Sequence, residues 1–481
     1  MKIIEEIEKT RQKVSLNNEI YKQKLYEQYF TPLDITKYMS NLFSDGNNLK
    51  ILDAGAGVGN LGAVTAIRYL EKKSTNNLEL TLIEWDERLI PTIKSNMKII
   101  KKQYDSFTYK VFNENFYFFG KNYLDKGLIF DRIILNPPYS IISKSTEEEI
   151  KILKELEIKT PNAYTNFLEL GYKLLSDNGE LVAIVPRSFC NGTRFTNFRL
   201  KLLENCNIEF IHSFVSRKEV FKEYGIFQEI VIIKLTKKKV DKVTICISDK
   251  LTKTRCEEFN KNEVIFINDR YKFIHIPDKV SDRQNLEKIS KLTSSLKELG
   301  LNISTGKVVE YREPYLTNSK ENDVAIMLYQ RNLVNNTIDF NIKSKSKSYI
   351  FKNELTINKI LEPGNYIIMK RMSYKENKKR VSSVVLKKED FNNKNIAIEN
   401  HLNYIHNNGK GLELQLALGL NAFLNSEILD IHIRRFNGHT QINASDIISL
   451  PMPSYETLYN VGKLILENKI EKDKIQELLY K

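Results

Sequence analysis

The chain has 481 residues, of which 41% are hydrophobic and 28% charged, a composition typical of a globular protein with two or three domains. No apolar run approaches the roughly 20 residues that a membrane-spanning helix needs, which excludes a membrane protein. The formal net charge of +14 favours a polyanionic partner such as nucleic acid, although a composition rich in Lys, Asn and Ile could equally reflect codon bias.

The N-terminus and the cysteines both indicate a cytoplasmic protein. The first residues, MKIIEEIEKTRQK, carry acidic side chains where a signal peptide has an apolar region. The cysteines are far apart and form no C-x-x-C pair, which indicates neither a disulfide framework nor a zinc site. Reduced thiols fit the same compartment. The four are Cys190, Cys206, Cys246 and Cys256.

An amphipathic helix is predicted from residue 1 to about residue 28, ahead of a polar segment. In that segment, Thr31 is expected to cap a helix whose first position is Pro32. Free N–H groups at the helix start can bind a carboxylate or another anion, and a plain capped helix is the alternative.

A glycine-rich turn follows the first predicted strand, within the segment Asn48 to Gly62. Glycines let the backbone approach a ligand that side chains would exclude. Gly57 to Gly62 also satisfies the dinucleotide pattern G-x-G-x-x-G, so a dehydrogenase must be considered. The second strand, Leu78 to Ile83, ends at Glu84, about where a carboxylate would bind ribose hydroxyls. We expect a ribose-bearing cofactor, with a structural strand-end acid as the alternative.

Polar and aromatic side chains follow the next two strands. The third strand, about Thr108 to Phe112, leads into Asn113 to Phe119, whose rings could stack on adenine or belong to the core. The fourth strand, Asp131 to Leu135, is stopped by Asn136-Pro137-Pro138-Tyr139, because each proline fixes φ and removes a donor. In an open α/β sheet, this corner presents an amide, backbone carbonyls and a ring where ligands bind.

The remaining elements complete a doubly wound, seven-stranded sheet. Lys144 to Lys159 lacks strand patterning and is predicted to be a mobile surface segment. A helix and a strand follow, and an antiparallel pair, about Ile208 to Val215 and Phe227 to Lys234, closes the sheet. We expect a first domain over residues 1–245, a connecting segment over 246–296, and a C-terminal domain over 297–481.

Five motifs occur in a distinctive order along the first domain. They are Thr31-Pro32, Asp53-Ala54-Gly55-Ala56-Gly57, Glu84, Asn115-Phe116 and Asn136-Pro137-Pro138-Tyr139. In this order the chain resembles the gamma arrangement of the adenine-N6 DNA methyltransferases. Three C-terminal segments are similar to those of the restriction-modification methylases of the PstI and BsuBI type. These segments are Ile303 to Lys307, Glu399 to Tyr404 and Arg435 to Ala444. The resemblance implies a Rossmann-like α/β methyltransferase domain followed by a mixed α+β target recognition domain.

The resemblance also implies S-adenosylmethionine as the methyl donor, with no metal. Residue 115 is often Asp in such enzymes; the amide oxygen of Asn115 can still accept from the N6 of the cofactor, but without charge. The implied cofactor-binding residues are Thr31, Asp53, Gly55, Gly57, Glu84, Asn115, Phe116 and Asn136.

The chemistry of the corner follows from its groups. An adenine amino nitrogen is a poor nucleophile because its lone pair is delocalised into the ring. The Asn136 amide oxygen and the Pro137 carbonyl would each accept one of its N–H groups, which favours a pyramidal nitrogen. Holding both reactants in line lowers the entropic barrier. The target must be flipped out of the duplex and stacked on Tyr139. For the other face, the resemblance favours Phe221 over Phe227.

The expected partner is double-stranded DNA, and a separate restriction endonuclease is an expected functional partner. Base-reading candidates lie near the C-terminus because Arg suits guanine and Asn or Gln suits adenine, although such groups could instead cap elements and brace the domains. They are Arg435, Asn437, His439, Gln441 and Asn443.

Other functions explain the sequence less completely. A dehydrogenase leaves the Asn136 to Tyr139 corner unexplained, and an RNA or protein-glutamine methyltransferase would not need the C-terminal half. A non-catalytic DNA-binding protein would be expected to have a degenerate pocket.

Overall fold

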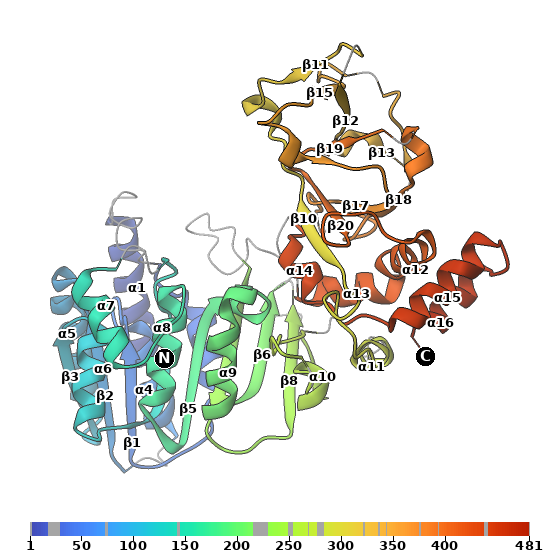
Figure 1. Cartoon of the computed structure of the whole chain (residues 1–481). Coiled ribbons are helices and arrows are strands. Elements are labelled where there is room, and N and C mark those ends of the chain that lie inside the picture. Colours follow the sequence, from blue (N-terminus) through green and yellow to red (C-terminus); the bar gives the residue numbers. More distant parts are fainter. Residues whose placement is uncertain are drawn as a thin grey trace. The chain divides into compact units, whose positions relative to one another are not determined.

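A computed structural model of the chain divides into two compact units (Figure 1). Unit 1 comprises residues 1–265 and 271–276, and unit 2 comprises residues 266–270 and 277–481. No helix among the described residues is long and apolar enough to cross a membrane. The structure describes residues 2–17, 29–72, 76–141, 145–214, 229–248, 254–267, 269–276, 283–320, 323–334, 337–342, 344–374, 377–392, 394–436 and 441–480.

Unit 1 is built on one sheet with the strand order β3-β2-β1-β4-β5-β7-β6-β8-β9. Strands β1 to β5 are mutually parallel, and β7 runs antiparallel between β5 and β6. The parallel arrangement brings the carboxyl ends of β1, β2 and β4 to one edge. The strands are β1 (Leu49–Ala54), β2 (Leu78–Glu84), β3 (Phe107–Asn113), β4 (Phe130–Leu135), β5 (Leu175–Pro186), β6 (Asn207–Phe214), β7 (Ile230–Thr236), β8 (Lys242–Ser248) and β9 (Arg255–Asn260).

The predicted count of seven strands is wrong, because β8 and β9 extend the sheet beyond β6. β8 pairs parallel with β6, and β9 pairs antiparallel with β8. Val243, Ile245 and Phe259 are buried, so the two strands contribute apolar side chains to the same core as the strands before them. The predicted domain boundary at residue 245 therefore falls within β8.

Helices cover both faces of this sheet (Figure 1). One core forms beneath α6 (Phe116–Asp125), α7 (Glu147–Glu155), α8 (Ala163–Lys173) and α9 (Thr196–Asn205). The other forms beneath α1 (Lys2–Asn17), α3 (Leu33–Asn41), α4 (Asn60–Glu71) and α5 (Ile90–Gln103). A short helix, α10 (Lys261–Val264), follows β9. Unit 1 is thus a doubly wound α/β domain, as predicted.

Part of the segment Lys144 to Lys159, which was predicted to be mobile, forms helix α7. The side chain of Thr146 accepts a hydrogen bond from the backbone of Glu149, and Glu149 accepts one from the backbone of Thr146. This capping box satisfies the N–H groups at the helix start. Leu153 then anchors the helix in the core.

Two cysteines differ from the expectation of reduced thiols. Cys246 and Cys256 are directly opposite in the register of β8 and β9 and form a disulfide. Cys190 and Cys206 are buried and free. The pairing depends on hairpin register, which the spacing of ten residues does not reveal.

Unit 2 is mixed α+β, as predicted. Its sheets have the orders β10-β20-β17-β18, β11-β15-β12-β19-β16 and β13-β14. The strands are β10 (Asn302–Thr305), β11 (Leu316–Thr317), β12 (Val324–Leu328), β13 (Leu333–Val334), β14 (Thr337–Ile338), β15 (Tyr349–Phe351), β16 (Ile360–Leu361), β17 (Tyr366–Lys370), β18 (Ser383–Leu386), β19 (Ile396–Ile398) and β20 (Leu402–His406). The helices are α11 (Arg283–Ser290), α12 (Leu414–Leu424), α13 (Glu427–Phe436), α14 (Ala444–Ile448), α15 (Tyr455–Leu466) and α16 (Lys472–Leu479).

Helices α12 and α15 pack unusually closely in this unit. A Cβ atom on Gly419 would lie 1.8 Å from the carbonyl oxygen of Leu458, and one on Gly462 would lie 1.7 Å from that of Gln415. The two backbones therefore touch where the glycines face them.

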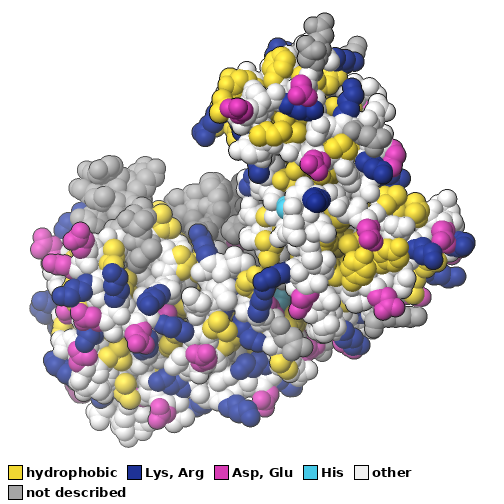
Figure 2. Space-filling model, in the orientation of Figure 1, with side chains coloured by type: hydrophobic (Ala, Val, Ile, Leu, Met, Phe, Trp, Pro, Cys, Tyr) yellow, Lys and Arg dark blue, Asp and Glu magenta, His cyan; other side chains and the backbone are white. Residues whose placement is uncertain are grey.

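Charged side chains of both signs are interspersed on the face of unit 1 that Figure 2 shows. On this face the net positive charge of the chain does not form one continuous basic stripe. The charge alone therefore does not locate a nucleic-acid surface.

Candidate active site

A cavity of about 300 Å³ lies where β1, β2 and β4 end. This is the edge at which open α/β sheets bind ligands. Seven of the predicted site residues that the structure describes in unit 1 line it. They are Thr31, Gly55, Gly57, Glu84, Asn115, Phe116 and Asn136.

The glycine turn after β1 forms one wall of the cavity. Gly55 and Gly57 have φ values of +72° and +59°, which other residues rarely adopt. A Cβ atom on Gly57 would lie 2.9 Å from the ring of Phe30, so a side chain there would displace Phe30 from the cavity lining. The wall is therefore bare backbone, open to a close-fitting ligand.

Glu84 holds this turn in place from the end of β2. Its Oε2 accepts from the Gly57 backbone nitrogen at 2.7 Å, and its Oε1 accepts from that of Asp86 at 2.9 Å. Burial raises the pKa of Glu84 to about 6. The carboxylate can accept further bonds from a ligand, since its two oxygens offer about four acceptor sites.

Trp85 follows Glu84 and lines the same cavity, although it belongs to none of the motifs recognised in the sequence. It is the only tryptophan of the chain, and its side chain is 61% exposed. Its position directly after the strand-end acid Glu84 is the sequence signal that could have identified it, because an aromatic ring there can pack against a bound ligand.

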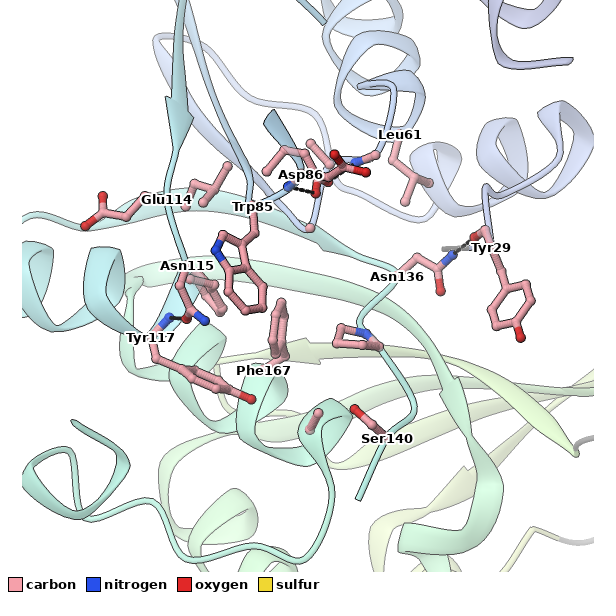
Figure 3. A pocket seen from close by; sticks show the side chains of 18 of the residues that line it. Tyr29, Leu61, Trp85, Asp86, Glu114, Asn115, Tyr117, Asn136, Ser140 and Phe167 are labelled. Carbon is pink, nitrogen blue, oxygen red and sulfur yellow. Dashed lines mark hydrogen bonds between the residues drawn. The ribbon is translucent and has the colours of Figure 1, made fainter. Parts of the chain in front are cut away.

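Aromatic side chains flank the part of the cavity next to Trp85 (Figure 3). Phe116 is buried, and its ring centroid lies 4.8 Å from that of Phe167. Asn115 caps α6 by accepting from the Tyr117 backbone nitrogen at 2.8 Å. Its Nδ2 donates to Glu149 Oε1 at 2.6 Å, and Glu149 also lines the cavity. This end is suited to a flat ring with polar groups on its edge.

Asn136 joins the end of β4 to the N-terminal segment. Its Nδ2 donates to the Tyr29 carbonyl at 2.7 Å and to Thr31 Oγ1 at 3.0 Å. Since a carbonyl can only accept, this contact fixes which side of the amide is nitrogen. The amide oxygen accepts a long contact from the Tyr139 hydroxyl at 3.5 Å, and its second lone pair leaves it available to a further donor.

The predicted cap at Thr31 is wrong by one position. Helix α3 begins at Leu33 with Pro32 as its N-cap residue, and it has no side-chain cap. The Thr31 hydroxyl contacts Asn136, and the Thr31 carbonyl accepts from Asn60 Nδ2 at 2.8 Å. Thr31 consequently braces the corner.

Three predicted residues of unit 1 lie outside the cavity lining. Asp53 is fully buried behind the turn, where its Oδ2 accepts from the Gly62 backbone and burial raises its pKa to about 7. Pro137 is buried. Tyr139 is partly buried beside Asn136, with its ring 6.4 Å from that of Tyr164, and burial raises its pKa. A direct role for Asp53 at the cavity is not supported by this position.

The predicted base-contacting residues are only partly described. Phe221, Phe227, Asn437 and His439 lie outside the described residues.

In unit 2, one described candidate is buried and another caps a helix, which the alternative given above would explain. Arg435 is buried on α13, and Asn443 caps α14 in a capping box with Asp446. The side-chain nitrogen of Gln441 contacts the sulfur of Met372 at 3.5 Å.

Comparisons with known proteins agree with this architecture. The family model for the Eco57I restriction-modification methylase matches residues 19–221. The type II methyltransferase M.BsuBI of Bacillus subtilis is 34% identical over 99% of this chain and 98% of its own length. The type II methyltransferase M.PstI of Providencia stuartii is 32% identical over 94% of this chain and 92% of its own length.

Among solved structures, the type IIL restriction-modification enzyme MmeI has a similar fold. The TM-score is 0.54 at 13% identity, covering 93% of this chain and 71% of that one.

Proposed function

This chain belongs to the family of type II DNA methyltransferases of restriction-modification systems, and we propose that it methylates the N6 amino group of adenine in duplex DNA with S-adenosylmethionine as the methyl donor. The observation that carries the proposal is the orientation of Asn136. Two acceptors hold its amide nitrogen, and this leaves its oxygen to accept from an amino group.

The cavity suits the parts of S-adenosylmethionine. The bare backbone at Gly55 and Gly57 admits a close-fitting ligand, Glu84 would accept from ribose hydroxyls, and Trp85 and Phe116 would flank the adenine ring. The cofactor would supply a methyl group that its sulfonium makes electrophilic. Thr31 would contribute to methyl transfer indirectly, because its hydroxyl orients the amide of Asn136.

Asn136 and Pro137 would act on the target amine. The Asn136 Oδ1 and the Pro137 carbonyl would each accept one N–H of the amino group, which draws the nitrogen lone pair out of the ring. A fixed amide also orients the nitrogen before reaction, so less entropy is lost in reaching the transition state. Neither residue needs to ionise.

The target base would be flipped out and stacked on Tyr139, with Phe221 as the proposed second face. We propose residues 297–481 as the target recognition domain. Within it, Gln441, Asn437 and His439 remain candidates for base contacts, whereas burial of Arg435 and the capping role of Asn443 favour structural roles. A separate restriction endonuclease is the proposed functional partner.

The test is methyl transfer from radiolabelled S-adenosylmethionine to duplex DNA, RNA and protein in parallel. We expect label in DNA alone and N6-methyladenine after hydrolysis to nucleosides. N4-methylcytosine would contradict adenine specificity, and label in RNA or protein would contradict the proposed substrate. Sequencing the modified DNA would then define the recognition site.

A further inference from the structure

The aromatic end of the cavity cannot by itself select adenine. Trp85, Phe116 and Phe167 present flat apolar surfaces to a ring. Any purine can stack against such surfaces. Selection must therefore come from polar groups that meet the edge of the ring, where adenine carries an amino group that donates hydrogen bonds.

Glu149 is a carboxylate held rigidly at this end of the cavity. It is the third residue of α7, and its side chain is 9% exposed. Its Oε1 accepts from Asn115 Nδ2 at 2.6 Å, and its Oε2 accepts from the Thr146 backbone nitrogen at 2.8 Å. Each oxygen has a second acceptor site. The carboxylate is thus fixed by two helix starts and can still accept from a ligand.

The neighbouring acceptors are less suitable. Asn115 uses its Oδ1 to cap α6, and the side chain of Glu114 points away from Asn115 and Phe167 in Figure 3. Asp86 is paired with Arg88 at 2.5 Å. Of the described carboxylates that line the cavity, Glu149 is therefore the one bonded directly to Asn115 beside the aromatic rings.

We propose that Glu149 determines cofactor specificity by accepting a hydrogen bond from the exocyclic amino group of the cofactor's adenine ring. This inference rests on the proposed function, because it assumes an adenosyl cofactor. A hypoxanthine ring carries a carbonyl oxygen in place of the amino group, and the carboxylate would repel that oxygen. Glu149 would also supply the negative charge that Asn115 lacks.

The test compares the binding of S-adenosylhomocysteine and S-inosylhomocysteine to the full-length protein by calorimetry. The variant is Glu149→Gln, whose amide oxygen can still accept from Thr146 and so retain the capping box, although its amide nitrogen can no longer accept from Asn115 Nδ2. Loss of the Asn115 bond should affect both ligands alike, so the ratio of the two affinities is the quantity that tests the inference. We expect the variant to weaken adenosyl binding by about 10- to 100-fold, the range for a lost hydrogen bond to a charged group. Inosyl binding should be unchanged or tighter, because the new amide group can donate to the ring oxygen.

Glu148→Gln is the matched control, because it removes the same charge from the exposed neighbouring residue. It should leave both affinities unchanged. An unchanged ratio between the two affinities in Glu149→Gln would overturn the inference. Failure of the wild-type protein to bind S-adenosylhomocysteine would instead overturn the proposed function, and this inference with it.

Discussion

Replacing Asn136 by alanine should greatly lower the turnover of the enzyme while leaving the protein folded. The substitution removes hydrogen bonds of 2.7 and 3.0 Å to Tyr29 and Thr31. At about 0.5 to 1.5 kcal/mol each, their loss should lower the free energy of unfolding by about 1 to 3 kcal/mol. This lowers the melting temperature by roughly 2 to 4 °C per kcal/mol and leaves a typical domain folded.

The expected loss of turnover is larger than this destabilisation can explain. Removing one oriented polar group from a reacting centre typically costs about 100- to 1000-fold in turnover. Single-turnover methylation of duplex DNA measures this loss, and calorimetry with S-adenosylhomocysteine checks that affinity changes little. Parallel losses of turnover, affinity and melting temperature would refute the reasoning, since they would make Asn136 a structural residue.

Asn113→Ala is the matched control for Asn136→Ala. Asn113 also donates two hydrogen bonds at a strand end, each 3.0 Å long, but its acceptors are the backbone carbonyls of Glu84 and Trp85. Its loss should weaken cofactor binding and leave turnover at saturating cofactor nearly intact.

Three further predictions concern the cavity and its surroundings. Trp85→Ala should weaken S-adenosylhomocysteine binding by about 10- to 100-fold through lost stacking. In the wild-type protein, the fluorescence of this sole tryptophan should change when S-adenosylhomocysteine binds. An unchanged affinity in Trp85→Ala would count against the stacking role. Burial raises the pKa of Glu84 to about 6, so the carboxylate should become protonated as the pH falls through this value. The affinity for S-adenosylhomocysteine should therefore be constant above pH 7 and fall about tenfold per pH unit well below pH 6. A flat calorimetric profile from pH 5 to 8 would exclude a role for the Glu84 carboxylate in binding the cofactor. Tyr139→Phe should change turnover less than about 5-fold, because the contacts of the Tyr139 hydroxyl are long, at 3.5 and 3.4 Å. Tyr139→Ala removes the ring and should abolish the fluorescence change of 2-aminopurine at the target position. Equal effects of both variants would favour a role for the hydroxyl.

The sequence predicted those features that depend on local patterns. The strand ends before Gly55, at Glu84 and before Asn136 were foreseeable because apolar runs stop at glycine, acid or proline, and parallel strands gather their carboxyl ends at one edge. The capping box between Thr146 and Glu149 was also readable as T-x-x-E, but the charged composition of the segment obscured it.

Features that depend on tertiary register could not be predicted in this way. The bond from Asn136 to Thr31 joins residues 105 positions apart, and nothing local to either residue indicates it. Strand β8 likewise became part of the sheet through pairing with β6, and β9 through pairing with β8, in a register that places Cys246 opposite Cys256. In both cases the relevant partner is defined only once the chain has folded.

The close packing of α12 against α15 has a consequence for directed evolution of unit 2. Libraries that vary unit 2, which contains the proposed target recognition domain, gain nothing by randomising Gly419 or Gly462, because even one added carbon would overlap a facing backbone carbonyl. Almost every member altered at either position would be lost to misfolding before selection could act on it. Diversity is better placed on the exposed loops of the same unit, where a side chain can change without displacing a helix.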